Sequence, residues 1–450
     1  MNIRFPLPKL ALLQPAPLRK RLWQAAFALL AVLLTFTIGN FFIPQDKAVG
    51  SRMLGHDFMA FYTAGTFARN GQFDKLYDLD AVRISEQDIA QQNNLEVGKS
   101  FGPYWNPPFY AWLPAAFAGL SYRPALAAWT GVNLICLLGA IILLIRFFPP
   151  SAAGDWRNSL LVLVLIITSM PFVQAISHGQ NTFMSLLLLT LVVTAWRSKK
   201  PAIAGLFCGL LFYKPQLAAV VAIVLGLSMG IRAMLGLGFV GGVLLLVTLL
   251  TMPGTFDEYL VRLPLNLKYM QVDHTYLWER HVTLKAFWRL LFQGRQAGEA
   301  SLLVNLLTWC SCGLILLGLG GAWWRSRKAG NHDRLIATTI VSMPLLMPFY
   351  FDYDLLLLSA AVMLLAAELV QRPAGMRLNL IDRLLVGSWI GLYAWLMVNP
   401  PLAAASGVNV AVVLLGTIGG LSIVRACRQH ADSALPALPP TAELDIKRAA

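Results

Sequence analysis

The chain has 450 residues, of which 57% are hydrophobic and only 13% are charged. A typical soluble domain carries about 25% charged residues, so this composition excludes an ordinary soluble protein and predicts an all-helical, polytopic membrane protein. The net charge of +14 would suggest a nucleic-acid partner in a soluble protein. Here we attribute it to the excess of Lys and Arg in cytoplasmic loops, and we expect no nucleic-acid partner.

The first segments set the orientation of the chain. Residues 1–21 contain five basic residues and are predicted to lie in the cytoplasm. Residues 22–43 are apolar, are long enough to span the bilayer and lack a small-residue cleavage site, which predicts a retained helix and not a removed signal peptide. Residues 44–124 then form a first outer loop, in which interfacial helices are expected.

The apolar stretch 105–120 in this loop decides the sidedness of every later segment. It is short and is interrupted by Pro107, Pro108 and Pro114, so we interpret it as a helix at the outer interface and not as a span. With this choice the basic loops 197–200 and 325–328 both face the cytoplasm, as the positive-inside rule favours.

The remaining apolar segments bring the total to about twelve transmembrane helices in one domain, 22–425. The predicted spans after the first are 125–145, 160–174, 183–195, 203–213, 217–227, 233–251, 302–323, 335–349, 355–369, 384–398 and 404–424. A second outer loop covers 253–300, and 426–450 is predicted to be a disordered cytoplasmic tail. Both termini are therefore expected in the cytoplasm. The chain is expected in the inner or plasma membrane of the cell.

This topology brings unusual polar residues to the outer ends of spans. Asp57 follows the first span beside His56, and the sequence SHGQN at 177–181 joins the third and fourth spans. Lys214 lies on the outer side between two short apolar segments, and YFDYD at 350–354 joins the ninth and tenth spans. Ionisable residues at such positions need partners or water, so their gathering on one side predicts a shared polar cavity.

Each of these features also has a purely structural interpretation. His56 and Asp57 could cap a helix, SHGQN could be a polar turn, and Lys214 could extend to the interface. Asp352 and Asp354 are two residues apart, which on an α-helix separates them by about 200°, so only one of them is expected to face a site. Agreement on one side of the membrane, and not any single residue, favours a functional cavity.

Several kinds of chemistry lack support in the sequence. It contains no phosphate-binding loop, dinucleotide fingerprint or zinc motif, so ATP hydrolysis, dinucleotide binding and a zinc site are not indicated. The five cysteines lie in apolar segments or at a basic end, and no disulfide is predicted.

A set of short motifs occurs in an order that resembles a known family. The motifs are DFMAFYTAG at 57–65 with LYD at 76–78, NPPF at 106–109, HGQN at 178–181, YKPQ at 213–216 and YFDYDLLLL at 350–358. From about residue 20 to 425 the chain resembles glycosyltransferase family 87, whose members are multi-pass enzymes of the GT-C fold. The resemblance also supports an interfacial position for 105–120.

The resemblance implies an integral membrane glycosyltransferase. Such an enzyme transfers a hexose, typically mannose, from a polyprenyl-phosphate donor to a hydroxyl of a glycolipid or polysaccharide acceptor on the extracytoplasmic face. It implies Asp57 as the general base, with inversion at the anomeric carbon. Because no second acidic residue adjoins Asp57, neither a divalent metal nor another cofactor is expected.

The implied chemistry assigns roles to the other polar residues. The leaving phosphate needs a fixed cation, for which Lys214 is the first candidate and Arg280 or Arg52 the alternatives. The candidates for binding sugar, phosphate or acceptor are His56, Tyr62, Trp105, His178, Gln180, Asn181, Gln216, His281, Asp352 and Asp354.

Two other classes of function are compatible with the pattern. Many spans and an interrupted hairpin at Lys214 would also suit a transporter or a flippase for lipid-linked sugars. A catalytically inactive assembly subunit is a third interpretation. The polar residues gather at one face and not at the midplane, which favours the enzyme. The sugar, the acceptor, the linkage and the oligomeric state are left open.

Overall fold

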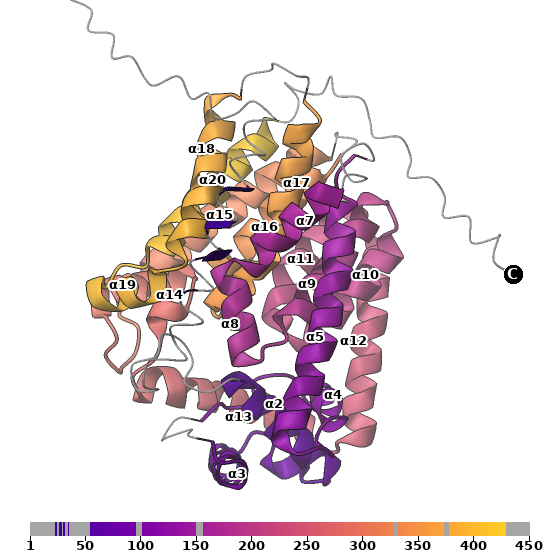
Figure 1. The fold of residues 1–450 in the computed structure, drawn as a ribbon, viewed down its shortest axis with the longest axis vertical. Helices are drawn as coiled ribbons and strands as arrows, with labels where there is room; N and C mark the ends of the chain where they lie inside the picture. Colours follow the sequence, from indigo (N-terminus) through magenta and orange to yellow (C-terminus); the bar gives the residue numbers. More distant parts are fainter. Residues whose placement is uncertain are drawn as a thin grey trace, which may run out of the picture.

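The structure, a computed structural model, describes residues 23–24, 27–28, 30–31, 35, 55–95, 101–149, 156–327, 331–372 and 378–428. In these residues the fold is all-helical, and the one β feature is an isolated bridge between His281 and Phe351. The helices form an elongated bundle with short helices at one end (Figure 1). An all-helical membrane protein was predicted from the composition, and the described residues confirm the helical class.

The elements follow the apolar segments of the sequence. In chain order they are α2 (His56–Arg69), η3 (Phe73–Lys75), α3 (Leu79–Gln92), η4 (Pro108–Ala111), α4 (Trp112–Ala115), α5 (Tyr122–Ile145), α7 (Trp156–Ile167), α8 (Met170–His178), α9 (Thr182–Arg197), α10 (Pro201–Leu210), η5 (Leu211–Tyr213), α11 (Pro215–Met229), α12 (Ile231–Thr251), α13 (Thr255–Lys268), η6 (Tyr269–Asp273), η7 (Trp278–Arg280), α14 (Leu284–Gln293), α15 (Leu302–Ser326), α16 (Asp333–Leu346), η8 (Asp352–Leu358), α17 (Ser359–Val370), α18 (Leu380–Trp395), α19 (Asn399–Ser406) and α20 (Val410–Cys427).

Among the described residues, five helical segments are long and apolar enough to cross a membrane: α5, α12, α15, η8 with α17, and α20. Two bent pairs, Ser159–Ile167 with α8 and α18 with α19, raise this number to seven if each pair is one span. The shorter apolar helices α9, α10 with η5, and α11 coincide with three of the predicted spans. The predicted span 22–43 lies mostly outside the described residues, so the total of twelve stays a prediction.

Two predicted spans are bent, and side chains at the breaks explain why. Between α7 and α8 the axis turns by 61°, where Thr168 and Ser169 bond back to carbonyls of the preceding turn and Pro171 begins the next helix. Between α18 and α19 it turns by 85°, at the Asn399–Pro400–Pro401 sequence. The sequence had predicted that the last span begins at residue 404. In the structure its helix, α20, begins at Val410.

The stretch 105–120 does not form the single interfacial helix that we expected. It contains only the short turns η4 and α4, because Pro107, Pro108 and Pro114 prevent a continuous hydrogen-bonded helix. This segment packs closely on α2, where a Cβ on Gly65 would lie 2.6 Å from the carbonyl carbon of Pro114. The segment therefore covers one end of the bundle, and its Trp112 side chain is partly exposed.

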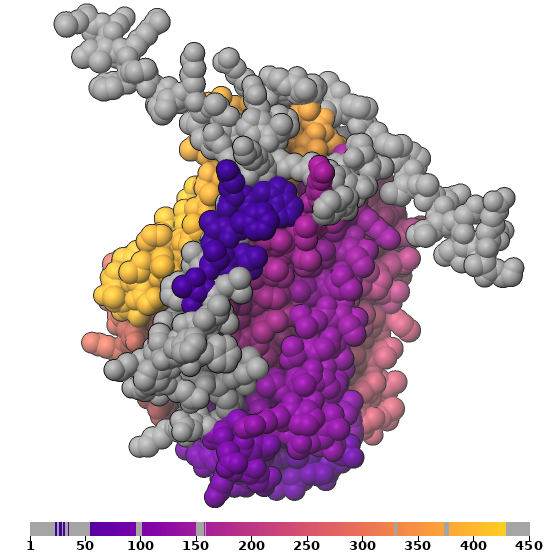
Figure 2. Space-filling model, viewed as in Figure 1, coloured from indigo at the N-terminus to yellow at the C-terminus, as the bar shows by residue number. Residues whose placement is uncertain are grey.

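The two ends of the bundle carry different chemistry. The segment from α2 to α4 covers one end, seen in indigo and purple at the bottom of Figure 2. At the other end, five charged side chains join α16, α17, α18 and α20: Arg334, Glu368, Arg372, Asp382 and Arg425. The Arg425 guanidinium bonds to both carboxylates of this arginine cluster, at 2.8 Å each. Asp352 and Glu368 lie near opposite ends of one helical segment, so the arginine cluster is far from Asp352.

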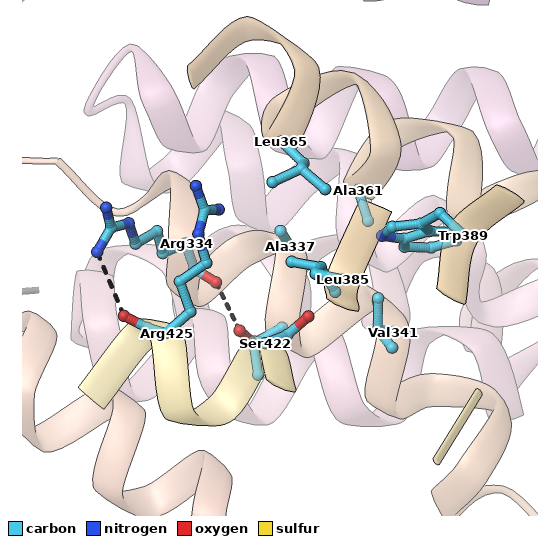
Figure 3. Close-up of a pocket in the computed structure, with 10 residues that line it drawn as sticks. Arg334, Ala337, Val341, Ala361, Leu365, Leu385, Trp389, Ser422 and Arg425 are labelled. Atoms are coloured by element: carbon cyan, nitrogen blue, oxygen red, sulfur yellow. Dashed lines mark hydrogen bonds between the residues drawn. The ribbon is translucent and has the colours of Figure 1, made fainter. Parts of the chain in front are cut away.

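A small cavity adjoins the arginine cluster (Figure 3). Arg334, Arg425 and Ser422 line one part of it, and Leu365, Ala361 and Trp389 line another. Its volume is about 20 Å³, which has room for about one water molecule. The cavity is therefore too small for a sugar or a lipid headgroup.

Candidate functional site

The candidate site is built around the first turn of α2, which carries Asp57. Gly55 precedes this helix with φ +79°, a conformation that favours glycine, and its amide donates to the Ser177 carbonyl at 2.8 Å. The Tyr122 hydroxyl donates to the Gly55 carbonyl, also at 2.8 Å. These contacts dock the start of α2 against the end of α8 and the start of α5, and they bring the Asp57 segment to HGQN.

Asp57 is an ionised carboxylate between two partners. Its Oδ2 accepts a hydrogen bond from Gln180 Nε2 at 2.7 Å, and its Oδ1 lies 3.5 Å from His56 Nδ1. Burial by itself would raise the pKa of Asp57, but the hydrogen bonds of His56 and Gln180 and the charge of Arg280 lower it to about 2. The same contact with Asp57 raises the pKa of His56. At neutral pH the site therefore holds a negative charge at Asp57.

Arg280, in η7, brings a guanidinium into the site. It forms a bidentate ion pair with Asp352. Nη2 donates to Oδ1 at 2.9 Å, and Nε donates to Oδ2 at 3.2 Å. Burial opposes its charge, but Asp352 holds the pKa of Arg280 above its usual value. Gln174 Nε2 also donates to Asp352, at 2.9 Å. The guanidinium is therefore fixed in direction and stays charged.

His178 orients the same guanidinium through its neutral ring. Its Nδ1 lies 2.8 Å from the Gln174 carbonyl, which can only accept, so Nδ1 carries the hydrogen. Its Nε2 lies 3.1 Å from Arg280 Nη1, which can only donate, so Nε2 has none. The hydrogen-bond pattern thus assigns a single tautomer, in which His178 and Asp352 together hold Arg280.

Lys214 and Asp354 form a second ion pair deeper in the bundle. Lys214 Nζ lies 3.0 Å from Asp354 Oδ1, which also accepts from the Thr182 hydroxyl at 3.0 Å. Both side chains are buried, with 9% and 6% of their surface exposed. The two charges compensate each other in this apolar environment, and separating them would be costly.

Tyr353 lies between the two ion pairs. Its ring centre is 5.9 Å from Arg280 Cζ and 5.7 Å from Lys214 Nζ, and its hydroxyl accepts from Gln180 at 3.1 Å. The Gln180 amide therefore connects this hydroxyl to Asp57. Because η8 is a tight 3-10 helix, Asp352 and Asp354 each reach a cation, whereas the sequence predicted that only one of them would face a site.

Four other predicted binding residues make no side-chain hydrogen bond to Asp57, Arg280 or Tyr353 in the described part of the chain. The Asn181 amide donates to the Tyr110 hydroxyl at 2.7 Å in a fully buried position, and the Tyr62 hydroxyl donates to the Leu120 carbonyl at 2.8 Å. Trp105 and Gln216 are half-buried. Arg52 lies outside the described residues.

His281 is enclosed among aromatic rings and has no exposed surface. Its ring centre lies 4.0 Å from that of Phe351 and 5.1 Å from that of Tyr276, whose hydroxyl is 2.9 Å from Nε2. Burial lowers the pKa of His281 to about 3, so it is neutral. These contacts make His281 part of the packing that holds the segment after η7 against Phe351 at the start of η8.

Sequence reasoning missed four polar residues near the site: Gln174, Thr182, Tyr353 and Glu86. Glu86 in α3 is 3% exposed, accepts from the Gly102 amide at 3.0 Å, and has its pKa raised to about 8 by burial. It shares a helical face with the buried Val82 and Ile89, so the i, i+4 spacing could have shown that this carboxyl is buried. Tyr353 gave no signal beyond its position between two aspartates.

The structure offers no evident ligand set for a metal ion. Within the described ranges, no group of three or more His, Cys, Asp or Glu side chains is arranged to hold one. Asp352 and Asp354 face Arg280 and Lys214 instead.

A family model described as glycosyltransferase family 87 matches residues 104–348, more than half of the chain. The match includes NPPF, HGQN, YKPQ and Arg280, whereas Asp57 and η8 lie outside it. No curated protein and no solved structure matches the chain.

Proposed function

The chain belongs to glycosyltransferase family 87 and is therefore a glycosyltransferase, and from its site we propose which reaction it performs. It transfers a hexose, with mannose as our first candidate, from a polyprenyl-phosphate donor to the hydroxyl of a glycolipid or polysaccharide. Several helices long enough to cross a membrane support a donor that is held in the bilayer. The observation that carries the proposal is the pair of opposite charges, Asp57 and Arg280, which both lie close to Tyr353.

In this proposal Asp57 accepts the proton of the acceptor hydroxyl. The acceptor oxygen bonds to the anomeric carbon while the bond from that carbon to the phosphate oxygen breaks, and the phosphate leaves with the electron pair. Asp57 is about 28% exposed, which allows an acceptor to reach it. Direct attack from the side opposite to the phosphate inverts the anomeric centre. A positioned base of this kind contributes about 10²- to 10⁴-fold to the rate.

Arg280 is our choice for the cation that stabilises the leaving phosphate. It lies close enough to Asp57 to lower the pKa of that residue, whereas Lys214 Nζ contacts both carboxylate oxygens of Asp354. Asp352 and His178 use three of the five N–H groups of Arg280, so two remain for phosphate oxygens. We assign Lys214 to the support of Asp354 and η8 beneath the site.

Sidedness follows from charge in the same proposal. Asp57 and Arg280 lie at the end of the bundle away from the arginine cluster, and a basic end favours the cytoplasm. Transfer would therefore take place on the extracytoplasmic face, where a lipid-linked donor needs no nucleotide. No cofactor is part of this scheme.

The test is transfer of label from a polyprenyl-phosphate [¹⁴C]mannose, and from other hexoses in parallel, to membrane acceptors. Asp57→Asn should lose about 100-fold or more of the wild-type rate while it folds normally. Asp74→Asn, an exposed aspartate in the same loop, is the matched control and should transfer as the wild type does. Transfer by Asp57→Asn at the control rate would exclude Asp57 as the base.

A further inference from the structure

We propose that the Tyr353 hydroxyl contacts the substrate and donates a hydrogen bond to the donor sugar hydroxyl next to the anomeric carbon. This inference rests on the proposed function and adds a residue that selects the sugar. It depends on three properties of Tyr353: its free hydrogen, its position and its rigid support.

The first property is the hydrogen on the Tyr353 hydroxyl. An ionised Asp57 carboxylate can only accept, so the nitrogen of the Gln180 amide must face it. The same nitrogen lies 3.1 Å from Tyr353 Oη and donates its second hydrogen there. Among the described residues, Tyr353 Oη makes this one hydrogen bond, and it makes it as the acceptor. The O–H hydrogen is therefore available to a ligand.

The second property is the position of Tyr353 close to both the base and the cation. Tyr353 Oη and Asp57 Oδ2 are at most 5.8 Å apart, the sum of their 3.1 and 2.7 Å distances to Gln180 Nε2. Arg280 Cζ lies 5.9 Å from the centre of the Tyr353 ring. With an acceptor oxygen at Asp57 and a phosphate at Arg280, the anomeric carbon lies between them. We place the hydroxyl on the neighbouring ring carbon against Tyr353 Oη, because that hydroxyl can accept the free O–H hydrogen.

The third property is rigid support of the ring. The ring stacks on Phe351 with centres 5.2 Å apart, and the His178 ring lies at 6.1 Å. Only 6% of Tyr353 is exposed, so little side-chain freedom is lost when a ligand binds. Hydrogen bonds to the hydroxyl next to the anomeric carbon strengthen as that carbon gains positive charge. A fixed donor at this point therefore favours the transition state more than the bound substrate.

The experiment compares two donors and two proteins. Wild type and Tyr353→Phe are assayed with polyprenyl-phosphate mannose and with its 2-deoxymannose analogue. With mannose we expect kcat of Tyr353→Phe to fall about 10- to 100-fold with KM little changed, as for a lost transition-state hydrogen bond. With the 2-deoxy donor, kcat of the two proteins should agree within about twofold. This donor lacks the sugar hydroxyl to which Tyr353 would donate, so removing the tyrosine hydroxyl costs nothing more.

Tyr350→Phe is the matched control in the same segment. Its hydroxyl donates to the Asp354 carbonyl at 3.0 Å, so its removal disturbs η8 without removing a group from the site. Any loss in Tyr350→Phe should be equal for both donors. Thermal unfolding of each variant reports whether the fold is retained.

The outcomes separate this inference from the proposed function. Equal losses of Tyr353→Phe with both donors would make Tyr353 a structural residue, and no loss with mannose would remove it from the site. Either result would leave the glycosyl transfer itself intact. If the wild type transfers no hexose from any polyprenyl-phosphate donor, the proposed function fails, and the role of Tyr353 fails with it.

Discussion

The surroundings of Asp57 stabilise its negative charge, and this weakens the affinity of the carboxylate for a proton. The hydrogen bonds of His56 and Gln180 lower its pKa to about 2, so the carboxylate is ionised at neutral pH but binds a proton only weakly in the resting protein. An acceptor hydroxyl becomes acidic only as its oxygen bonds to the anomeric carbon. In the proposed reaction the proton therefore moves late, when the bond to the phosphate is already breaking.

The pH dependence of the transfer rate tests whether the pKa of Asp57 is lowered in the folded protein. Because the folded-state pKa of Asp57 lies below its ordinary value of 3.8, Asp57 stabilises the native state above about pH 4, and this contribution is lost as the pH falls toward 2. We expect kcat/KM to show no acid limb with a pKa near 4. A limb at that pH, abolished in Asp57→Asn, would mean that the carboxylate lacks the stabilisation described above.

Glu86 gives a prediction of opposite sign. Burial raises its pKa to about 8, so the folded protein keeps a proton that the unfolded chain releases near pH 4.5. Stability from this group is fully present below pH 4.5 and is lost as the pH rises toward 8. We expect Glu86→Gln to match the wild type near pH 5 and to be more stable at pH 8, by on the order of 1–3 kcal/mol. Thermal unfolding in detergent at both pH values measures this, and identical pH slopes in the two proteins would contradict it.

At the scale of elements, the pair α10 and α12 is packed through glycines. A Cβ on Gly205 would lie 1.9 Å from the Ala233 carbonyl oxygen, and one on Gly236 would lie 2.2 Å from the Ala202 carbonyl oxygen. These distances are far below van der Waals contact, so the two backbones touch only because side chains are absent. Such close approach is a common basis for helix association in membranes.

This packing predicts different effects for two similar substitutions. Gly205→Ala should destabilise the protein by about 3 kcal/mol or more, because the helices must separate to admit the methyl group. Gly238→Ala in α12 meets no atom within 4 Å and should be neutral or slightly stabilising. Unfolding temperatures of the purified variants measure both, and equal temperatures would rule out the close contact.

At the scale of the whole molecule, two clusters of charged side chains lie toward opposite ends of the bundle. One cluster, around Asp57, Arg280 and Lys214, includes groups that a substrate could reach. The other is the arginine cluster, in which three guanidiniums meet two carboxylates and join four helices. Paired and hydrogen-bonded charges of this kind are costly to break, so the arginine cluster stabilises the packing of α16 to α20.

The sidedness of the molecule is a prediction at this scale. In a chain whose five cysteines are replaced by alanine, a single cysteine at Asp74 should react with a membrane-impermeant maleimide on intact cells. A cysteine at Lys199, in the turn between α9 and α10, should react only after the membrane is permeabilised. Both positions are exposed, so accessibility to solvent does not distinguish them. Labelling of position 199 on intact cells would overturn the proposed orientation.

Hydropathy and motif order were sufficient to predict an all-helical membrane protein and its family, because long apolar runs and short polar motifs are local in sequence. The same information placed Asp57, HGQN, YKPQ and the 350–354 segment together. It failed at 105–120 and at the bends near Ser169 and Asn399, where proline and backbone-bonding side chains override an apolar pattern.

The sequence by itself therefore determined the environment of this chain and which motifs converge. Only the tertiary structure decided how their side chains pair: Asp352 with Arg280, Asp354 with Lys214, and Tyr353 between them. Lys214 and Asp354 are 140 positions apart, and their contact depends on the angles at which helices and the η8 turn pack. Those angles result from the close fit of many side chains at once, which the periodicity of one segment does not encode.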